Sequence, residues 1–89
     1  MTDRERVAQG CRILDEARPG WRVAINPDTL DIGDPFQCIL GQLYGTFERG
    51  LEALDLSSRW AAEAGFANDP GVNDDEALTT AWLEVEGIR

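Results

Sequence analysis

The side chains of this chain that could do chemistry are almost all carboxylates. Its 89 residues include 17 Asp and Glu, eight Lys and Arg that are all arginine, two Cys and no His. Without histidine there are no imidazole bases, no Ser-His or Cys-His nucleophile pairs and no histidine metal ligands. Without lysine there is no Schiff-base chemistry and no lysine for a phosphate-binding loop. We therefore expect a protein that is not an enzyme and binds no cofactor.

Three aspartates around a turn come closest to an acid–base site. Asp28, Asp31 and Asp34 could share acid and base roles if burial separated their pKa values. Their spacing suits turns and helix caps equally well, so we assign them no catalytic role. The stretch 68–76 (NDPGVNDDE) is rich in oxygen ligands, but its Pro-Gly pair does not fit an EF-hand loop. We expect a turn and a helix cap there, and no metal site.

The two cysteines are predicted to be buried, unreactive thiols. Cys11 falls on the apolar stripe of one predicted helix, and Cys38 lies on the small-residue side of another. The sequence begins with charged residues and shows neither a secretion signal nor a membrane span, so we expect a cytoplasmic location. Thiols stay reduced in that compartment. A Cys11–Cys38 disulfide is the alternative.

The net charge of −9 is distributed unevenly along the chain. Residues 1–20 hold four acids and four arginines, whereas the remainder holds thirteen acids and four arginines. Such a surface repels phosphate backbones and anionic membranes, so we expect neither direct nucleic-acid binding nor membrane binding. The negative charge either keeps a small protein in solution or attracts a protein partner with a basic surface.

The helices that must position these groups form a small all-α domain. We predict one domain over residues 1–89, a bundle of about four helices with short connections. A capping box at Thr2 and Glu5 begins a helix that ends near Ala17. Ser57 caps a short third helix, and a second capping box at 73–76 begins the last one.

Residues 35–54 are predicted to form a continuous central helix. Apolar residues recur there at helical spacing, and Asp34 is a suitable N-cap. The opposite side carries Cys38, Gly41 and Gly45, so we expect another element to pack closely on it as well. The apolar stripe comprises Phe36, Ile39, Leu40, Leu43, Tyr44, Phe47, Leu51 and Leu54.

Residues 21–33 are the irregular segment of the predicted fold. The run WRVAI alternates like a strand but has no partner strand, so we expect an extended segment or one helical turn. Trp21, Trp60 and Trp82 are predicted to lie in the core, and Phe66 to plug it beyond the third helix. Leu83 falls on the outer side of the last helix.

One candidate interface follows from the last helix. If its aromatic or aliphatic residues are exposed beside its acidic start, they form a patch suited to a protein partner. This candidate interface comprises Asp74, Asp75, Glu76, Trp82 and Leu83. An exposed Leu83 also allows a homodimer without requiring one.

Several short motifs resemble a group of small acidic proteins of actinobacteria and actinobacteriophages. The most distinctive is the run CILGQLYG at 38–45, preceded by RPGW at 18–21 and LDI at 30–32 and followed by GF at 65–66. The absence of lysine fits the same source. The resemblance implies no activity and no functional residues.

Three functions compete on the sequence. The first is a non-enzymatic interaction protein that docks on a basic partner surface. The second is a DNA mimic, which requires acids in rows along an elongated face. The third is a small-molecule binding module with a pocket between the central helix and residues 21–33.

Overall fold

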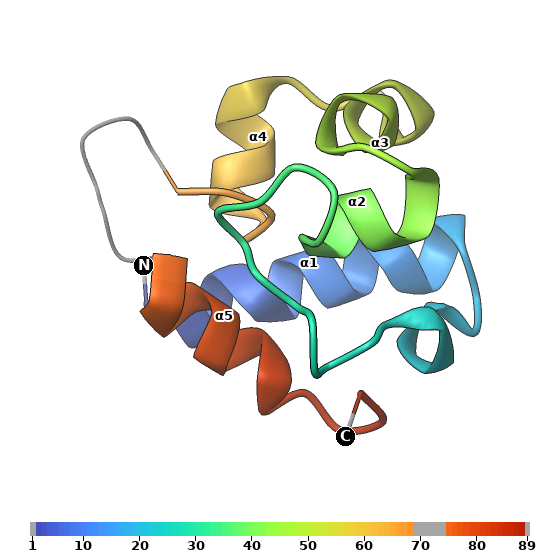
Figure 1. Cartoon of the computed structure of the whole chain (residues 1–89). Helices are drawn as coiled ribbons and strands as arrows, with labels where there is room; N and C mark the ends of the chain where they lie inside the picture. The colour runs from blue at the N-terminus through green and yellow to red at the C-terminus, as the bar shows by residue number, and fades with distance from the viewer. Residues whose placement is uncertain (1, 69–74, 89) are drawn as a thin grey trace.

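The computed structural model describes residues 2–68 and 75–88 and is all-α over those residues. The predicted fold class is confirmed. The described part measures 32 × 26 × 22 Å. Helix α1 lies beneath α2, and α5 packs against a different side of α1 (Figure 1). Its helices are α1 (Asp3–Ala17), the 3₁₀ helix η1 (Trp21–Ala24), α2 (Ile39–Tyr44), α3 (Phe47–Leu54), α4 (Ser58–Glu63) and α5 (Asp75–Leu83).

Helix α1 begins and ends where the sequence predicts. The Thr2 hydroxyl accepts from the Glu5 amide at 3.2 Å, and the Glu5 carboxylate accepts from the Thr2 amide at 3.3 Å. These bonds satisfy amides that would otherwise lack partners. The Thr2 amide and the Thr2 hydroxyl, which donates to the same carboxylate at 3.1 Å, lower the pKa of Glu5 because they stabilise its charged form. The buried side of α1 carries Val7, Gly10 and Leu14.

The core is organised around the indole of Trp82. Its ring meets Trp21 edge-on at 5.9 Å and stacks on Phe66 at 5.7 Å between centroids. All three side chains are at most 1% exposed, as predicted for these residues. Gly10 lets α1 approach this cluster, since a methyl group there would lie 2.8 Å from Trp82 Cη2 and overlap the Ala64 carbonyl oxygen. The core therefore depends on a close contact that only glycine allows.

The predicted continuous helix over 35–54 is wrong. It is two helices, α2 and α3, joined through Gly45, whose φ of +97° no right-handed helix accommodates. The Pro35 carbonyl oxygen then accepts from the Phe47 amide at 2.8 Å, which closes the turn. Helix α3 folds back on α2, with Gly50 against the Leu40 side chain. Gly45 is therefore an exposed turn residue and not a tight contact.

Residues 35–38 precede α2 instead of belonging to it. The Asp34 carboxylate accepts from the Phe36 amide at 2.8 Å and so caps a single turn. Helix α2 starts after that turn, with Cys38 as its N-cap: the thiol accepts from the Gly41 amide at 3.3 Å. Phe36 is 62% exposed, contrary to its predicted place on the buried stripe. Cys38 and Gly41 are buried, as predicted.

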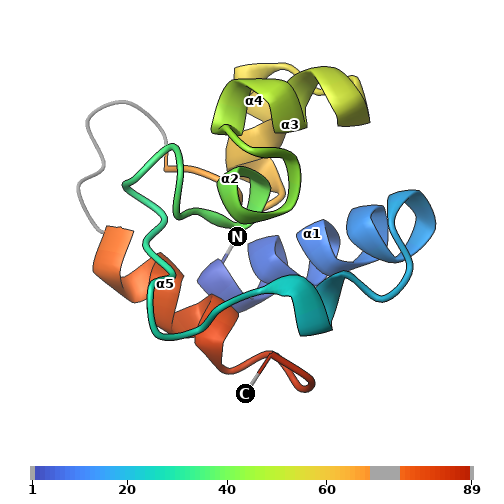
Figure 2. The same cartoon turned by 45° about the vertical axis from the view of Figure 1, so that its right-hand side comes forward.

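The segment between α1 and α2 begins as one helical turn, which was one of the two predicted forms. Trp21 and Ile25 are buried four residues apart, whereas Val23 is 88% exposed. A strand would have placed Val23 on the same side as the other two. The chain then runs alongside α5 before rising toward α2 (Figures 1 and 2).

Helix α4 starts at its predicted cap but exposes its tryptophan. The Ser57 hydroxyl accepts from the Trp60 amide at 3.3 Å. Ala61 and Ala62 are buried against the rest of the molecule, while Trp60 is 55% exposed, so its predicted core position is wrong. In so short a helix Ala61 and Ala62 occupy the inner face, and Trp60, which precedes them, points outward.

Candidate functional site

The candidate site is an acidic groove between residues 28–31 and the outer face of α5. Its volume is about 540 Å³. Asp28 and Asp31 come from one side, and Glu76 comes from the first turn of α5. Among residues 2–68 and 75–88, no arginine lines the groove. We call this site the acidic groove; its lining is Asp28, Thr29, Leu30, Asp31, Glu76, Thr79, Thr80 and Leu83.

Helix α5 presents opposite faces to the core and to the acidic groove. Leu78 and Trp82, one turn apart, are fully buried. Glu76 is exposed and Leu83 is half-buried, and both line the groove. The predicted interface is therefore partly corrected: Glu76 and Leu83 lie on an accessible surface, whereas Trp82 is a core residue.

The acidic residues at the start of α5 have two different roles. The Asp75 carboxylate accepts from the Asn68 side-chain amide at 2.8 Å and lies against Gly33, so it does not line the groove. Asp74, the predicted capping box at 73–76 and most of the turn at 68–76 fall outside the described residues or depend on them. Asp75 therefore fastens the chain, while Glu76 faces the groove.

Two side chains, those of Gln42 and Thr79, hold residues 26–33 in place beside α5. The Gln42 carboxamide accepts from the Asn26 amide at 2.6 Å and donates to the Asn26 carbonyl oxygen at 3.2 Å. The Thr79 hydroxyl accepts from the amide of buried Ile32 at 3.0 Å. The backbone that carries Asp28 and Asp31 is thus fastened at both ends, to α2 and to α5.

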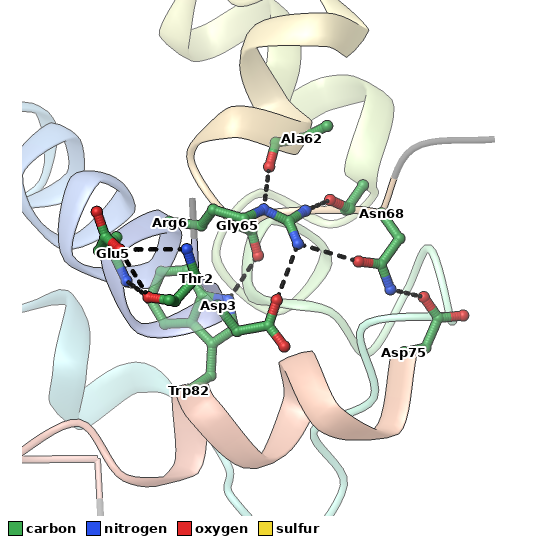
Figure 3. Close-up of polar contacts among 10 residues, drawn as sticks. Thr2, Asp3, Glu5, Arg6, Ala62, Gly65, Asn68, Asp75 and Trp82 are labelled. Atoms are coloured by element: carbon green, nitrogen blue, oxygen red, sulfur yellow. Dashed lines mark hydrogen bonds and ion pairs between the residues drawn. The ribbon is translucent and has the colours of Figure 1, made fainter. Parts of the chain in front are cut away.

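A guanidinium network fixes the start of α5 to the rest of the molecule (Figure 3). Arg6 Nε donates to the Ala62 carbonyl oxygen at 2.8 Å, and Nη2 donates to that of Ala67 at 2.7 Å. Nη1 reaches the Asp3 carboxylate at 3.1 Å and the Asn68 side-chain oxygen at 3.2 Å. Because Asn68 also holds Asp75, Arg6 links α1, the end of α4 and the start of α5.

The sequence identified the acids of the groove but not their proximity. Asp28 and Asp31 were considered only together with Asp34, because their spacing along the chain suggested a local group. Leu30 and Ile32 are buried on alternate positions, which turns the intervening Asp31 outward. That alternation was visible in the sequence; the helix opposite it was not.

Neither thiol resembles a reactive centre. Both cysteines are free, so the alternative Cys11–Cys38 disulfide is not formed. Burial raises the pKa of both thiols, because a thiolate loses its hydration there. Cys38 is 1% exposed and caps α2, whereas Cys11 is only half-buried, against its predicted burial. Across residues 2–68 and 75–88, no cluster of three potential metal ligands occurs.

Comparison with known proteins gives this chain no relatives to draw on. No protein-family model matches it, no curated protein matches it, and no solved structure matches it. Within the described ranges, none of the helices has the length and apolar character needed to cross a bilayer.

Proposed function

We propose that this chain is a non-enzymatic interaction protein that docks on the basic surface of a protein partner through the acidic groove. One observation carries the proposal: three carboxylates, from Asp28, Asp31 and Glu76, line a groove to which the described residues contribute no cationic side chain. Asp28 and Asp31 lie on the chain before α2, and Glu76 lies on α5. None of these three carboxylates takes part in an ion pair within the described part of the chain. A partner's arginine or lysine side chains would supply the missing charge.

The electrostatics of the whole chain support docking on a basic surface. A net charge of −9 on a 9.8 kDa protein creates a long-range negative field. Such a field speeds encounter with basic partners and weakens as salt is added. At short range, half-buried Leu83 offers an apolar contact beside the charges. We expect recognition that is fast, salt-sensitive and localised by the groove.

The residues of the most distinctive motif, CILGQLYG at 38–45, make contacts that stabilise the fold. In the run 38–45, Cys38 caps α2, Gln42 holds Asn26, and Gly45 makes the turn to α3. The Arg18 guanidinium lies over the Tyr44 ring, with its Cζ 5.3 Å from the ring centroid. Each group thus has a structural partner, which favours binding over catalysis as the function. A source in actinobacteria or their phages, and a cytoplasmic location, are parts of the same proposal.

The DNA-mimic alternative draws less support from the shape. It requires rows of acids along an elongated face, whereas the described chain measures 32 × 26 × 22 Å. A small-molecule module has a different difficulty: the pocket between residues 32–33 and the predicted central helix has a volume of only about 130 Å³, which is small for a ligand site. Thermal shift with small cationic metabolites distinguishes it, because a docking protein should show flat melting temperatures.

Two variants with equal charge test the docking proposal. The first replaces the groove acids (Asp28→Asn, Asp31→Asn, Glu76→Gln), and the matched control replaces three exposed acids around α3 (Glu48→Gln, Glu52→Gln, Asp55→Asn). Each variant, and the wild type in parallel, is immobilised on a resin and incubated with an actinobacterial lysate. The proteins that each resin retains are quantified by mass spectrometry over a series of salt concentrations. We expect basic proteins on the wild type and the control at low salt, and their loss from the groove variant.

Two results would contradict the proposal. If both variants lose the same proteins equally, net charge alone causes the retention and the groove has no special role. If the wild type retains nothing at low salt, no basic partner exists in that lysate and docking on such a partner is wrong for this source.

A further inference from the structure

We propose that two copies of this chain associate through a second groove, which lies between α1 and α5 on a different face of α5. We call it the α1–α5 groove. Its volume is about 250 Å³, and its lining is Arg4, Val7, Ala8, Cys11, Ala81, Glu84 and Val85. The proposed occupant is α1 of a second copy. This inference goes beyond docking on a basic partner and does not depend on it.

The floor of the α1–α5 groove is apolar, and the chain leaves it partly uncovered. Ala8 is exposed, while Cys11, Ala81 and Val85 are half-buried beside the core. These side chains are small, so another helix could approach α1 closely. In both views α1 and α5 lie alongside each other (Figures 1 and 2).

Charge indicates a second copy as the occupant. Outside residues 1–20 the chain carries thirteen acids against four arginines, so most of its surface repels another copy. Residues 1–20 hold four of each sign, and the described residues at the rim of this groove comprise one cation and one anion. Arg4 and Glu84 form an ion pair there at 3.2 Å, with side chains 83% and 49% exposed. A neutral rim neither attracts a basic partner nor repels a copy of itself.

The charges along α1 also complement each other in an antiparallel pair. Arg4, Ala8, Cys11 and Asp15 follow one another at intervals of four, three and four residues, so they share one stripe of the helix. A twofold axis midway between Ala8 and Cys11 places Arg4 opposite Asp15 of the second copy at each end. It also places Ala8 opposite Cys11 of the second copy. The interface is then isologous, as most homodimer interfaces are.

Asp15 can take part in such a pair without giving up its own contacts. One of its oxygens, Oδ1, accepts from Trp21 at 2.9 Å and from Arg22 at 2.5 Å. The side chain is 49% exposed, so the second oxygen can accept from an arginine of the second copy. We expect a modest affinity, because the groove is small and its charged ends stay near solvent.

Sedimentation equilibrium over a wide concentration range tests the association. We expect the mean mass to rise from 9.8 kDa toward twice that value. Ala8→Arg places a large cation in the groove and should weaken association about tenfold or more. Ala53→Arg makes the same change at an exposed position of α3 and should leave association intact. Circular dichroism confirms that each variant is folded.

A short bismaleimide gives an independent measure of where the two copies meet. At mildly alkaline pH it should link Cys11 of one copy to Cys11 of the other, whereas Cys38 is buried. Cys11→Ser should abolish the linked dimer. A single mass of 9.8 kDa at all concentrations would overturn the proposal. So would a dimer that Ala53→Arg weakens and Ala8→Arg does not. Neither result bears on the acidic groove, whose three acids are unchanged in these variants.

Discussion

The two faces of α5 differ in nearly every physical respect, although they belong to the same nine residues. The inner face carries Leu78 and Trp82, which are fully buried. The Trp82 indole donates to the Gly65 carbonyl oxygen at 2.6 Å, so its polar atom has a partner. The outer face carries Glu76 and Leu83, which line a groove whose described residues include no cationic side chain. The inner face stabilises the fold, and the outer face is available for binding.

This difference separates residues that can be changed without loss of the fold from residues that cannot. Across the described residues, every buried side-chain nitrogen or oxygen has a hydrogen-bond partner. The residues that carry the carboxylates of the acidic groove are exposed instead, although Asp31 also accepts from the Gly33 amide at 2.9 Å. Changes inside should therefore reduce the free energy of unfolding, and changes in the groove should reduce only binding.

Trp82→Ala should have the largest effect on stability. It removes the ring that stacks on Phe66 and meets Trp21, and leaves a cavity against Gly10. We expect the free energy of unfolding to fall by about 3–5 kcal/mol, measured by urea denaturation. Leu83→Ala, on the outer face of the same helix, is the matched control and should cost far less. Equal losses would show that the two faces do not differ as described.

Arg6→Met should have the next largest effect. It keeps the apolar stem but removes bonds to two backbone carbonyl oxygens, to Asp3 and to Asn68. The Arg6 side chain is only 14% exposed, so solvent cannot fully replace these bonds. We expect a loss of about 2 kcal/mol in urea denaturation. Arg12→Met, at an exposed position of α1, should change stability little.

Thr79→Val should modestly reduce both the stability of the fold and the order of the segment that lines the acidic groove. The side-chain shape is kept, but the Ile32 amide loses its acceptor at 3.0 Å. We expect a loss of about 1 kcal/mol in urea denaturation. Because this bond holds one side of the acidic groove, hydrogen exchange at 28–33 should also become faster. Unchanged exchange would mean that other contacts fix this segment.

Asp15 gives the protein a part of its acid sensitivity. Hydrogen bonds from Arg22 and Trp21 lower the pKa of Asp15 below its ordinary value. A carboxyl whose pKa is lower in the folded state adds stability above its unfolded pKa, and this is lost as pH falls through the folded value. The stability difference between the wild type and Asp15→Asn should therefore shrink as pH falls. Urea denaturation from neutral to strongly acidic pH measures it, and a constant difference would contradict this origin.

The groove variant with Asp28→Asn, Asp31→Asn and Glu76→Gln should have the smallest effect on the fold. Its acids pair with no cation in the part of the chain that the structure covers, so removing their charge breaks no ion pair. We expect the free energy of unfolding to change by less than about 0.5 kcal/mol. A large loss in urea denaturation would mean that these acids stabilise the fold and would blur the distinction between the two faces.

The local chemistry of the chain was readable from the sequence at several places. The capping box of α1, its end at Ala17 and the Ser57 cap of α4 are as predicted. Each depends on a few adjacent residues, which is why it can be recognised without the rest of the fold. The buried positions of Leu78 and Trp82 follow from helical spacing in the same way.

The errors arise where the tertiary structure overrides a regular pattern. Residues 36–54 repeat at helical spacing on both sides of Gly45, so periodicity alone could not show the break there. Folding back lets Pro35 accept from Phe47 and lets Gly50 pack on Leu40, contacts that a straight helix lacks. Trp60 was assigned to the core because tryptophan is usually buried, but the two alanines that follow it hold the inner face of α4.

The helical class, the caps of α1 and α4, the excess of acid and the lack of histidine and lysine follow from the amino-acid sequence alone. These depend on composition and on neighbours a few residues apart. The tertiary structure decided which acids meet, because Asp28 and Glu76 are distant in sequence and converge only when residues 28–32 pack beside α5, where Thr79 accepts from the Ile32 amide. It also decided that Trp82 belongs to the core and Leu83 to the groove, since a helix shows its two faces only once something covers one of them.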